Sequence, residues 1–139
     1  MEIPDDFKPV YHYKMRNGEV TSEKTLDPTL WDEEGVVYLR VHGKDVLYVG
    51  KSDGKLSSRI RWHIRNGIPK PRTEPGRRYL EWAKGREITN ITILAYKPEP
   101  ISLFGLQIGV HLGLEAALIR EFKPRFNGKG RKTDSQEGD

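Results

Sequence analysis

The side chain of this sequence best suited to chemistry is a glutamate set among apolar residues. Glu115 occupies a position of a helical stripe where an apolar residue is expected, and the other members of the stripe are Ile108, Leu112, Ile119 and Phe122. A carboxylate inside a buried stripe is unfavourable unless it is paired or binds a cation. The pattern predicts either a ligand for a hard divalent cation or a glutamate that turns toward water or an internal arginine.

Two further pairs of reactive residues lie in the first half of the chain. Arg59 and His63 are four residues apart, so both project from the same side of a helix. Tyr38 and Tyr48 have the same parity on two short strand-like segments, and a register that keeps them on one face brings them close together. Basic helices often contain such an Arg–His pair, and tyrosines often only cover a sheet face. Each pair alone is therefore a weak indication of catalysis.

Charge is spread unevenly along the 139 residues, whose net charge is +4. Residues 1–34 hold four basic and nine acidic residues, whereas the segment from Lys51 to Arg86 holds eleven basic and three acidic residues. A local positive block attracts a polyanion, most often nucleic acid. Arg72, Arg77 and Arg78 are the candidates for DNA contact, with a solvated loop as the alternative.

Length and composition limit the class of protein. A chain of 139 residues suits one domain with one modest core. No apolar run approaches the ~20 residues that span a bilayer, and the acidic start lacks the apolar region of a signal peptide. The absence of cysteine excludes disulfides and thiolate metal sites. We expect an intracellular, cytoplasmic protein without a membrane partner.

Alternating apolar residues predict the strands that position the tyrosines. Residues 36–42 alternate between two faces and predict a half-buried strand. A turn and a second strand over 46–50 complete an antiparallel hairpin. Residues 88–96 alternate in the same way and predict a third strand. Residues 1–34 are expected to form an N-terminal arm or a weak hairpin, either extended or part of the same domain.

Helical periodicity predicts the elements that carry the remaining candidates. Apolar residues at every fourth position from Leu56 to Ile64 predict a helix that ends at Asn66. A shorter helix is expected from about Gly76 to Lys84. The last helix is expected from about Leu106 to Phe122, where Pro124 stops it. Residues 128–139 read as a flexible tail.

The order of these motifs resembles that of the GIY-YIG nucleases. In that family a tyrosine of the first motif precedes a tyrosine of the second by about ten residues, as Tyr38 precedes Tyr48. A Leu-x-x-Arg motif opens the first helix, as Leu56 and Arg59 do here, and many members have a histidine at the position of His63. Each motif alone is weak, whereas their order and spacing together are specific.

The resemblance extends to the end of the last helix. The family pattern Glu-x-x-Leu-Ile, followed by Lys-Pro-x-Tyr/Phe-Asn, is matched throughout from Glu115 to Asn127. One departure is Gly35, which stands three residues before Tyr38 where the family name implies two. The match covers residues 35–127, with an apparent insertion at about 67–87. It implies an α+β fold, in which helices flank a three-stranded antiparallel sheet in the order β-β-α-α-β-α.

The resemblance also implies roles for the matched residues. Glu115 would be the sole protein ligand of one Mg²⁺ or Mn²⁺, and Asn127 would support the site through hydrogen bonds. Tyr38 would take the proton of the attacking water, although Tyr48 remains an alternative base. Arg59 would hold the scissile phosphate. The matched residues Tyr48 and His63 would orient water and phosphate or assist proton transfer, and Lys51 would add positive charge.

The resemblance therefore implies a metal-dependent DNA endonuclease that hydrolyses phosphodiester bonds. The layout leans toward a small restriction-type enzyme with two copies acting on two strands. A repair, recombination or mobile-element nuclease remains open, as does a nucleic-acid-binding module without catalysis. A metal-free RNA-binding domain would use Tyr38 and Tyr48 as stacking residues and would leave Glu115 without a role.

Overall fold

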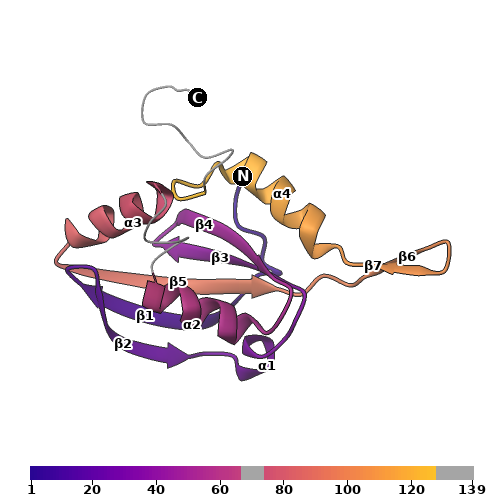
Figure 1. Cartoon of the computed structure of the whole chain (residues 1–139), viewed down its shortest axis with the longest axis horizontal. Helices are drawn as coiled ribbons and strands as arrows, with labels where there is room; N and C mark the ends of the chain where they lie inside the picture. Colours follow the sequence, from indigo (N-terminus) through magenta and orange to yellow (C-terminus); the bar gives the residue numbers. More distant parts are fainter. Residues whose placement is uncertain (67–73, 128–139) are drawn as a thin grey trace.

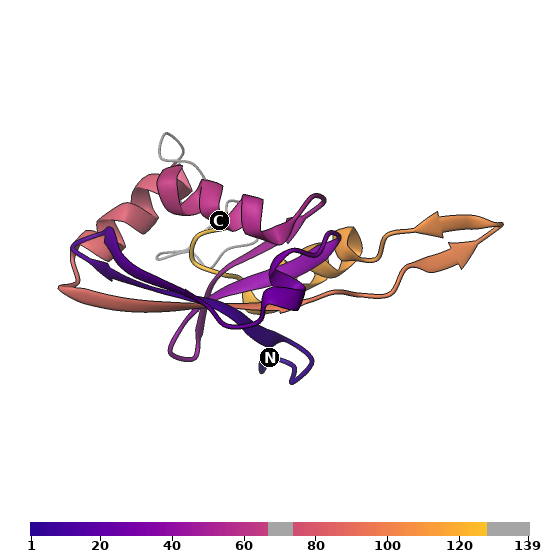
Figure 2. The same cartoon turned by 90° about the horizontal axis from the view of Figure 1, so that it is seen from below.

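Five antiparallel strands form the main sheet of the protein, in a computed structural model that describes residues 1–66 and 74–127. The strands are β1 (Lys8–Arg16), β2 (Glu19–Thr25), β3 (Val36–His42), β4 (Asp45–Ser52) and β5 (Ile88–Tyr96). Their order is β2-β1-β5-β3-β4, so β2 and β4 form the edges (Figure 1). A separate two-stranded ribbon, β6 (Ile101–Leu103) and β7 (Leu106–Ile108), projects away from this body (Figure 2).

Helices cover both faces of the sheet around β3. They are α1 (Pro28–Trp31), α2 (Leu56–Asn66), α3 (Glu74–Lys84) and α4 (His111–Phe122). α2 and α3 lie on one face (Figure 2), where Leu56 and Ile60 of α2 are fully buried. α4 lies beside the edge strand β4 (Figure 1), and its Leu118 packs with Leu39 on the opposite face. No helix in the described parts of the chain is long and apolar enough to cross a membrane.

The three predicted strands and the predicted α+β class are confirmed, but the predicted count of three strands is wrong. The segment 8–25, expected as an arm or weak hairpin, is a hairpin that joins the sheet. β1 pairs with β5 along almost its whole length, from Lys8 opposite Ala95 to Arg16 opposite Ile88. The pairing is favourable because alternate residues of β1 bury large side chains, and Tyr11 also stacks on Trp31 with ring centroids 4.2 Å apart.

Two further expectations need correction. β3 is not half-buried: Val36 to Val41 are all buried because helices cover both sheet faces. The last helix begins at His111 rather than near Leu106, since residues 106–108 form β7 instead. Ile108 and Leu112 are therefore exposed, at 42% and 53%, and the buried stripe that singled out this helix's glutamate does not exist in that form.

The remaining helices agree with the periodicity. α2 ends at Asn66 as predicted, and α3 begins at Glu74, two residues before the predicted start. The proposed DNA-contact residue Arg72, most of the proline- and arginine-rich loop and the predicted tail lie outside the described residues.

Candidate active site

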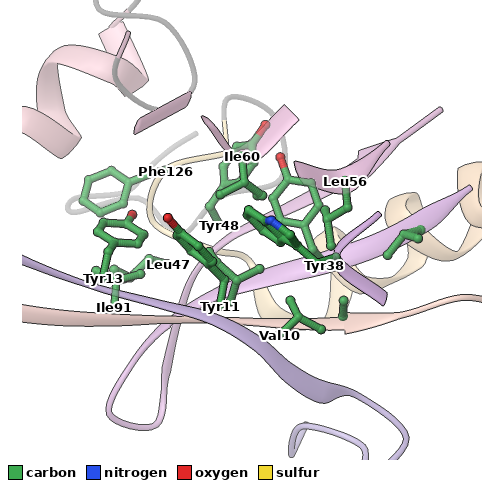
Figure 3. Close-up of a cluster of buried hydrophobic side chains, with 14 of the residues drawn as sticks. Val10, Tyr11, Tyr13, Tyr38, Leu47, Tyr48, Leu56, Ile60, Ile91 and Phe126 are labelled. Carbon is green, nitrogen blue, oxygen red and sulfur yellow. The ribbon is translucent and has the colours of Figure 1, made fainter. Parts of the chain in front are cut away.

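The two candidate tyrosines meet on one face of the β3–β4 hairpin. The register places Tyr38 opposite Gly50 and Arg40 opposite Tyr48, so the tyrosines are diagonal neighbours. Their ring centroids are 6.2 Å apart. Figure 3 shows both rings in the aromatic core, which also contains Tyr13 and Phe126. The predicted proximity of the two tyrosines is confirmed.

Gly50 allows this arrangement because the Tyr38 ring lies directly over its backbone. A Cβ atom on Gly50 would lie 2.4 Å from both Cζ and Oη of Tyr38. That separation is far below van der Waals contact, so any side chain here would displace the tyrosine. Gly50 therefore has a steric role, because the absence of a side chain there lets the Tyr38 hydroxyl take its position.

His63 reaches the same cluster from α2. Its Nδ1 lies 3.3 Å from the Tyr38 hydroxyl oxygen, and its ring centroid is 5.9 Å from that of Tyr48. Burial, together with the positive charges of Arg40 and Arg59, lowers the pKa of His63 to about 3. The ring is thus neutral at physiological pH, and in the tautomer with a bare Nδ1 the Tyr38 hydroxyl donates to it.

Burial dominates the ionisation of both phenols. It raises the pKa of Tyr38 well above the ordinary value, and the neighbouring Tyr48 raises it further. Burial also raises the pKa of Tyr48. The positive charges of Arg40 and Arg59 lower both pKa values but do not outweigh burial. Either phenol therefore needs additional positive charge before it can serve as a base near neutral pH.

A basic pocket opens beside this cluster at the end of β4. It has a volume of about 400 Å³, and its lining includes Lys51, Lys55 and Arg59. Arg59 is exposed, so its guanidinium is accessible to a ligand. A larger cavity of about 650 Å³ lies at the other end of β4, around Lys44 and Phe122, and contains none of the candidate residues. The smaller pocket is the one whose charges suit a phosphate.

Glu115 approaches from α4 on the edge of the sheet. Its side chain is partly buried, and burial raises the pKa of this carboxyl group. Lys51 and Arg59 lower that pKa, whereas the charge of Asp53 raises it. Glu115 in turn raises the pKa of Tyr48. The carboxylate thus lies within electrostatic range of the basic pocket and of the tyrosine cluster.

Asn127 makes hydrogen bonds to the backbone of β4 and, among the described residues, none to the tyrosine hydroxyls. Its Nδ2 donates to the Val49 carbonyl oxygen at 2.9 Å, and its Oδ1 accepts from the Val49 amide at 2.9 Å. The Phe126 amide also donates to the Leu47 carbonyl oxygen, at 3.0 Å. The chain after α4 therefore continues the sheet at the free edge of β4, and it fixes the strand that carries Tyr48.

Comparison with known proteins finds a relative by sequence and similar folds among solved structures. No family model matches the chain. UvrABC system protein C of Microcystis aeruginosa is 34% identical over 96 residues, which cover 68% of this chain and 12% of that protein. A mutant of bacteriophage T4 EndoII superposes with a TM-score of 0.61 at 16% identity, over 88% of this chain and 92% of the other. The restriction endonuclease HPY188I in complex with product DNA gives 0.53 at 17% identity, over 88% and 79%.

These likenesses support the resemblance of the chain to the GIY-YIG nucleases. The two superpositions establish likeness of fold. The sequence likeness covers 68% of this chain, which spans about 12% of the length of UvrABC system protein C.

Two carboxylates lie near the basic pocket, Glu115 and Asp53, and Asp53 already accepts hydrogen bonds from Lys51 and His111. Glu115 is therefore the candidate carboxylate for a divalent cation. Among the described residues, no three His, Cys, Asp or Glu side chains are grouped to hold a metal ion. A partly buried glutamate next to a solvent-accessible basic pocket suits a hard cation that keeps several of its waters. The donor set fits Mg²⁺ or Mn²⁺ and does not resemble a closed structural metal site.

Several residues near the site were not identified from the sequence. Asp53 accepts hydrogen bonds from Lys51 Nζ at 2.7 Å and from His111 Nε2 at 2.8 Å, and these bonds lower the pKa of its carboxyl group. Arg40 is buried beside the tyrosines. The spacing of Lys51 and Asp53 was visible in the sequence, but the partnership with His111 depends on where α4 begins.

The proposed DNA-contact residues that the structure describes, Arg77 and Arg78, lie away from this site. Arg77 and Arg78 belong to α3, which packs against β1. α3 and α4 lie toward opposite ends of the sheet in both views (Figures 1 and 2). The structure thus brings together Tyr38, Tyr48 and His63 with the basic pocket, and it leaves the α3 arginines outside this cluster.

Proposed function

We propose that this chain is a metal-dependent DNA endonuclease that hydrolyses phosphodiester bonds. The observation that carries the proposal is the meeting of the Tyr38–Tyr48–His63 cluster with a basic pocket at the edge where Glu115 approaches. Hydrolysis of a phosphodiester needs an activated water and positive charge around the phosphorus. Each of these requirements has a candidate group in this one region.

Binding of the scissile phosphate falls to the pocket. Arg59 and Lys51 supply positive charge, and Lys55 lines the same surface. Arginine holds phosphate oxygens through two parallel N–H donors, so Arg59 is the expected clamp in the transition state. Arg77 and Arg78 on α3 are proposed to contact the DNA backbone farther from the cleaved bond, and Arg72 is proposed as a further DNA contact.

Glu115 would hold the Mg²⁺ or Mn²⁺ ion. When bound, the cation supplies positive charge that stabilises the phosphate and the leaving oxygen. Since this is the only carboxylate proposed as a ligand, replacing it with an amide should remove the metal without changing the side chain's size.

Tyr38 is the proposed base for the attacking water, with Tyr48 as the alternative. With Nδ1 of His63 unprotonated, the Tyr38 hydroxyl is oriented by a hydrogen bond of 3.3 Å. Loss of the hydroxyl proton to solvent gives the phenolate, which is the reacting form. The water oxygen bonds to phosphorus as a water proton passes to the phenolate oxygen. The phosphorus–oxygen bond to the leaving group breaks, and the leaving oxygen takes a proton from solvent. Because burial raises the pKa of Tyr38, the step depends on the positive charges around the phenol.

A restriction-type enzyme is the form of this activity that we favour. HPY188I, whose structure contains product DNA, is a restriction endonuclease and shares this fold. Cutting both strands would follow from two copies acting on one site. A structure-specific repair or mobile-element nuclease is the alternative, and it would leave nicked or branched products in place of discrete linear fragments.

Plasmid cleavage tests the proposal. Supercoiled DNA incubated with the protein in Mg²⁺ or Mn²⁺ should be cut, and EDTA should stop the reaction. Glu115→Gln should abolish cutting while DNA binding, measured by fluorescence anisotropy, persists. Tyr38→Phe should slow cutting about 10²-fold or more, the usual contribution of a positioned base.

Two control variants separate catalysis from folding. Glu121→Gln alters an exposed carboxylate on the same helix as Glu115, and Tyr96→Phe alters a tyrosine that packs on the opposite sheet face. Both should cut at the unaltered rate. Cleavage that survives EDTA, or that is unchanged in Glu115→Gln, would show that the proposed chemistry is wrong.

A further inference from the structure

The ribbon of β6 and β7 is the most unusual surface of the molecule. Its strands pair from Ile101 opposite Ile108 to Leu103 opposite Leu106, and Phe104 and Gly105 form the turn with φ values of 54° and 76°. Both views show the ribbon extending away from the main sheet (Figures 1 and 2). An isolated two-stranded ribbon is at best marginally stable in water, so contact with another surface would stabilise it.

The side chains of the ribbon are apolar and unusually exposed. Phe104 is 99% exposed and Leu106 63%, and the other apolar members are Ile101, Leu103 and Ile108 at 52%, 50% and 42%. The patch continues onto α4 at Leu112, which is 53% exposed. Contiguous exposed apolar surface of this kind marks interaction sites in soluble proteins.

Charge indicates which partner fits. From Ile101 to Leu114 there is no Lys, Arg, Asp or Glu, although the chain as a whole has a net charge of +4. A DNA-binding ribbon would need Lys or Arg to neutralise phosphates, and this one has neither. Two copies of a chain with a net charge of +4 gain no attraction from that net charge, and a ribbon without charged residues lets them meet without like-charge repulsion.

We propose that the ribbon docks on a second copy of this chain. Both edges of the ribbon carry unpaired backbone groups, and identical antiparallel ribbons can pair about a two-fold axis so that each buries the other's apolar side chains. The ribbon leads directly into α4 through Gly109 and Val110. The proposed contact therefore links the two helices that carry Glu115, whether or not the protein is a nuclease.

Sedimentation equilibrium tests this proposal. The wild-type protein should have a mass above that of the monomer, whereas the double variant Leu103→Glu, Leu106→Glu should be monomeric with unchanged circular dichroism. Ile88→Glu is the matched control, because Ile88 is also exposed, at 47%, but lies at the start of β5. It should keep the wild-type mass.

Two outcomes would overturn the proposal. One is a monomeric wild-type protein at the highest soluble concentration. The other is a double variant that keeps the higher mass. If that variant also loses affinity for a DNA duplex, the ribbon is assigned to DNA.

A second, independent observation concerns a buried arginine. Arg40 on β3 is fully buried, and it donates a hydrogen bond from one terminal nitrogen to the Tyr13 hydroxyl. Its Cζ lies 5.6 Å from the centroid of the Tyr13 ring. Among the described residues, its Nε and its other terminal nitrogen have no hydrogen-bond partner, and no carboxylate pairs with it.

Such a charge is costly to bury and cannot be removed by deprotonation. Arginine stays charged in proteins, and an unpaired charge in the interior is strongly unfavourable. Arg40 lies two residues from Tyr38 on the same face of β3 and directly opposite Tyr48 in the register. Directly opposite residues of an antiparallel pair are in side-chain contact range.

We infer that Arg40 is a positioning residue that fixes a positive charge behind the tyrosine cluster. The ionisable groups around it are Tyr38, Tyr48, Tyr13 and Tyr79, with His63 and Arg59 on α2. A fixed positive charge favours any state in which a phenol is negative and opposes any in which the imidazole is positive. The catalytic consequence rests on the proposed nuclease function, whereas the effect on His63 does not.

An NMR titration of His63 tests the inference without relying on activity. In the wild-type protein, His63 should stay neutral well below the ordinary imidazole pKa of about 6.5. Arg40→Gln, whose amide can still bond to the Tyr13 hydroxyl, should raise the His63 pKa, and Arg40→Lys should restore most of the shift. Arg120→Gln, on the exposed side of α4, should leave it unchanged.

The pH dependence of cleavage gives the second readout. If a phenolate is the base, Arg40→Gln should displace the pH–rate profile upward, with about a tenfold loss of rate for each pH unit of displacement. An ordinary His63 pKa in the wild-type protein would overturn the inference even if Arg40→Gln does not fold. So would an unchanged His63 pKa in a folded Arg40→Gln. Absence of cleavage in wild type, with His63 behaving as expected, would reject only the nuclease function.

Discussion

The two faces of β3 are built from different chemistry. Val37, Leu39 and Val41 point to the face covered by α4, where they pack with other aliphatic side chains. Tyr38 and Arg40 point to the face covered by α2 and α3, among aromatic rings and the imidazole of His63. One strand of seven residues therefore carries both a purely apolar core and the candidate active site.

The contrast indicates that stability and function are divided between the faces. Aliphatic packing is non-directional and depends mainly on the area removed from water. The aromatic face instead depends on contacts that require a specific geometry. Examples are the hydrogen bond of Tyr38 to His63 and the close approach of the Tyr38 ring to Gly50. Changes on the first face should lower the free energy of unfolding, and changes on the second should mainly lower the rate of cleavage.

The largest expected effect on stability is that of Leu39→Ala. Leu39 is fully buried on the aliphatic face, and such a truncation costs about 3 kcal/mol because it leaves a cavity. Urea unfolding measures the loss. Cleavage per folded molecule should be unchanged. Leu26→Ala, at a leucine that is 42% exposed, is the control and should cost far less; a Leu39→Ala protein that is stable but cuts poorly would contradict the division between the faces.

Asn127→Ala should have the next largest effect and lower the free energy of unfolding by about 2 kcal/mol. The substitution removes both hydrogen bonds to Val49 and leaves a buried amide and carbonyl without partners. Because Val49 is adjacent to Tyr48, cleavage should also fall in the fraction that stays folded. Asn90→Ala is the control, since Asn90 makes one exposed hydrogen bond, to His12. Equal losses in the two variants would show that the Asn127 pairing contributes little.

The parts of the fold that could be predicted are those whose own pattern of apolar residues indicates which face is buried. Alternation was enough to identify β3, β4 and β5, and a four-residue apolar period was enough for α2. β2 could not be found in this way, because six of its seven residues are exposed and only Val20 is partly buried. Its place depends on pairing with β1. The place of β1 in turn depends on β5, whose paired residues follow at distances in sequence that run from Arg16 opposite Ile88 to Lys8 opposite Ala95.

Glu115 shows how a correct candidate can follow from a wrong pattern. Apolar residues at 106–108 fit a helical period and an exposed ribbon equally well, and the turn at Phe104 and Gly105 decides in favour of the ribbon. The stripe argument therefore failed, whereas the family spacing still singled out the same glutamate. Arg40 had no local signal at all, since its burial results from helices packed over a sheet face.

Gly50→Ala should have a smaller effect on stability and a clear effect on cleavage. The new methyl group would overlap the Tyr38 ring, and relief of such overpacking costs about 1 to 2 kcal/mol. The displaced hydroxyl should no longer meet His63, so cleavage should fall about as far as in Tyr38→Phe. Gly113→Ala is the control, because a Cβ atom there meets nothing within 4 Å, and alanine favours a helix. Gly50→Ala with unchanged cleavage would show that the position of Tyr38 is not critical.

The smallest expected effect near neutral pH is the pH dependence of stability contributed by His63. Its pKa is about 3 in the folded protein, below its unfolded value, so the unfolded state binds a proton first as the pH falls. The free energy of unfolding should therefore decrease as the pH falls below about 6.5, by about 1 kcal/mol over the first pH unit. The contribution is complete above the unfolded pKa and is lost progressively down to the folded one.

Urea unfolding at a series of pH values measures this slope, and the comparison of variants isolates His63 from the carboxylates. His63→Gln cannot titrate, so its stability should fall less steeply with acid than that of the wild-type protein. His42→Gln, at a partly buried histidine that stacks edge-on against Trp82, should keep the wild-type slope. If His63→Gln and the wild-type protein lose stability in parallel, His63 is charged in the folded state, and the aromatic face does not hold its ionisable groups neutral.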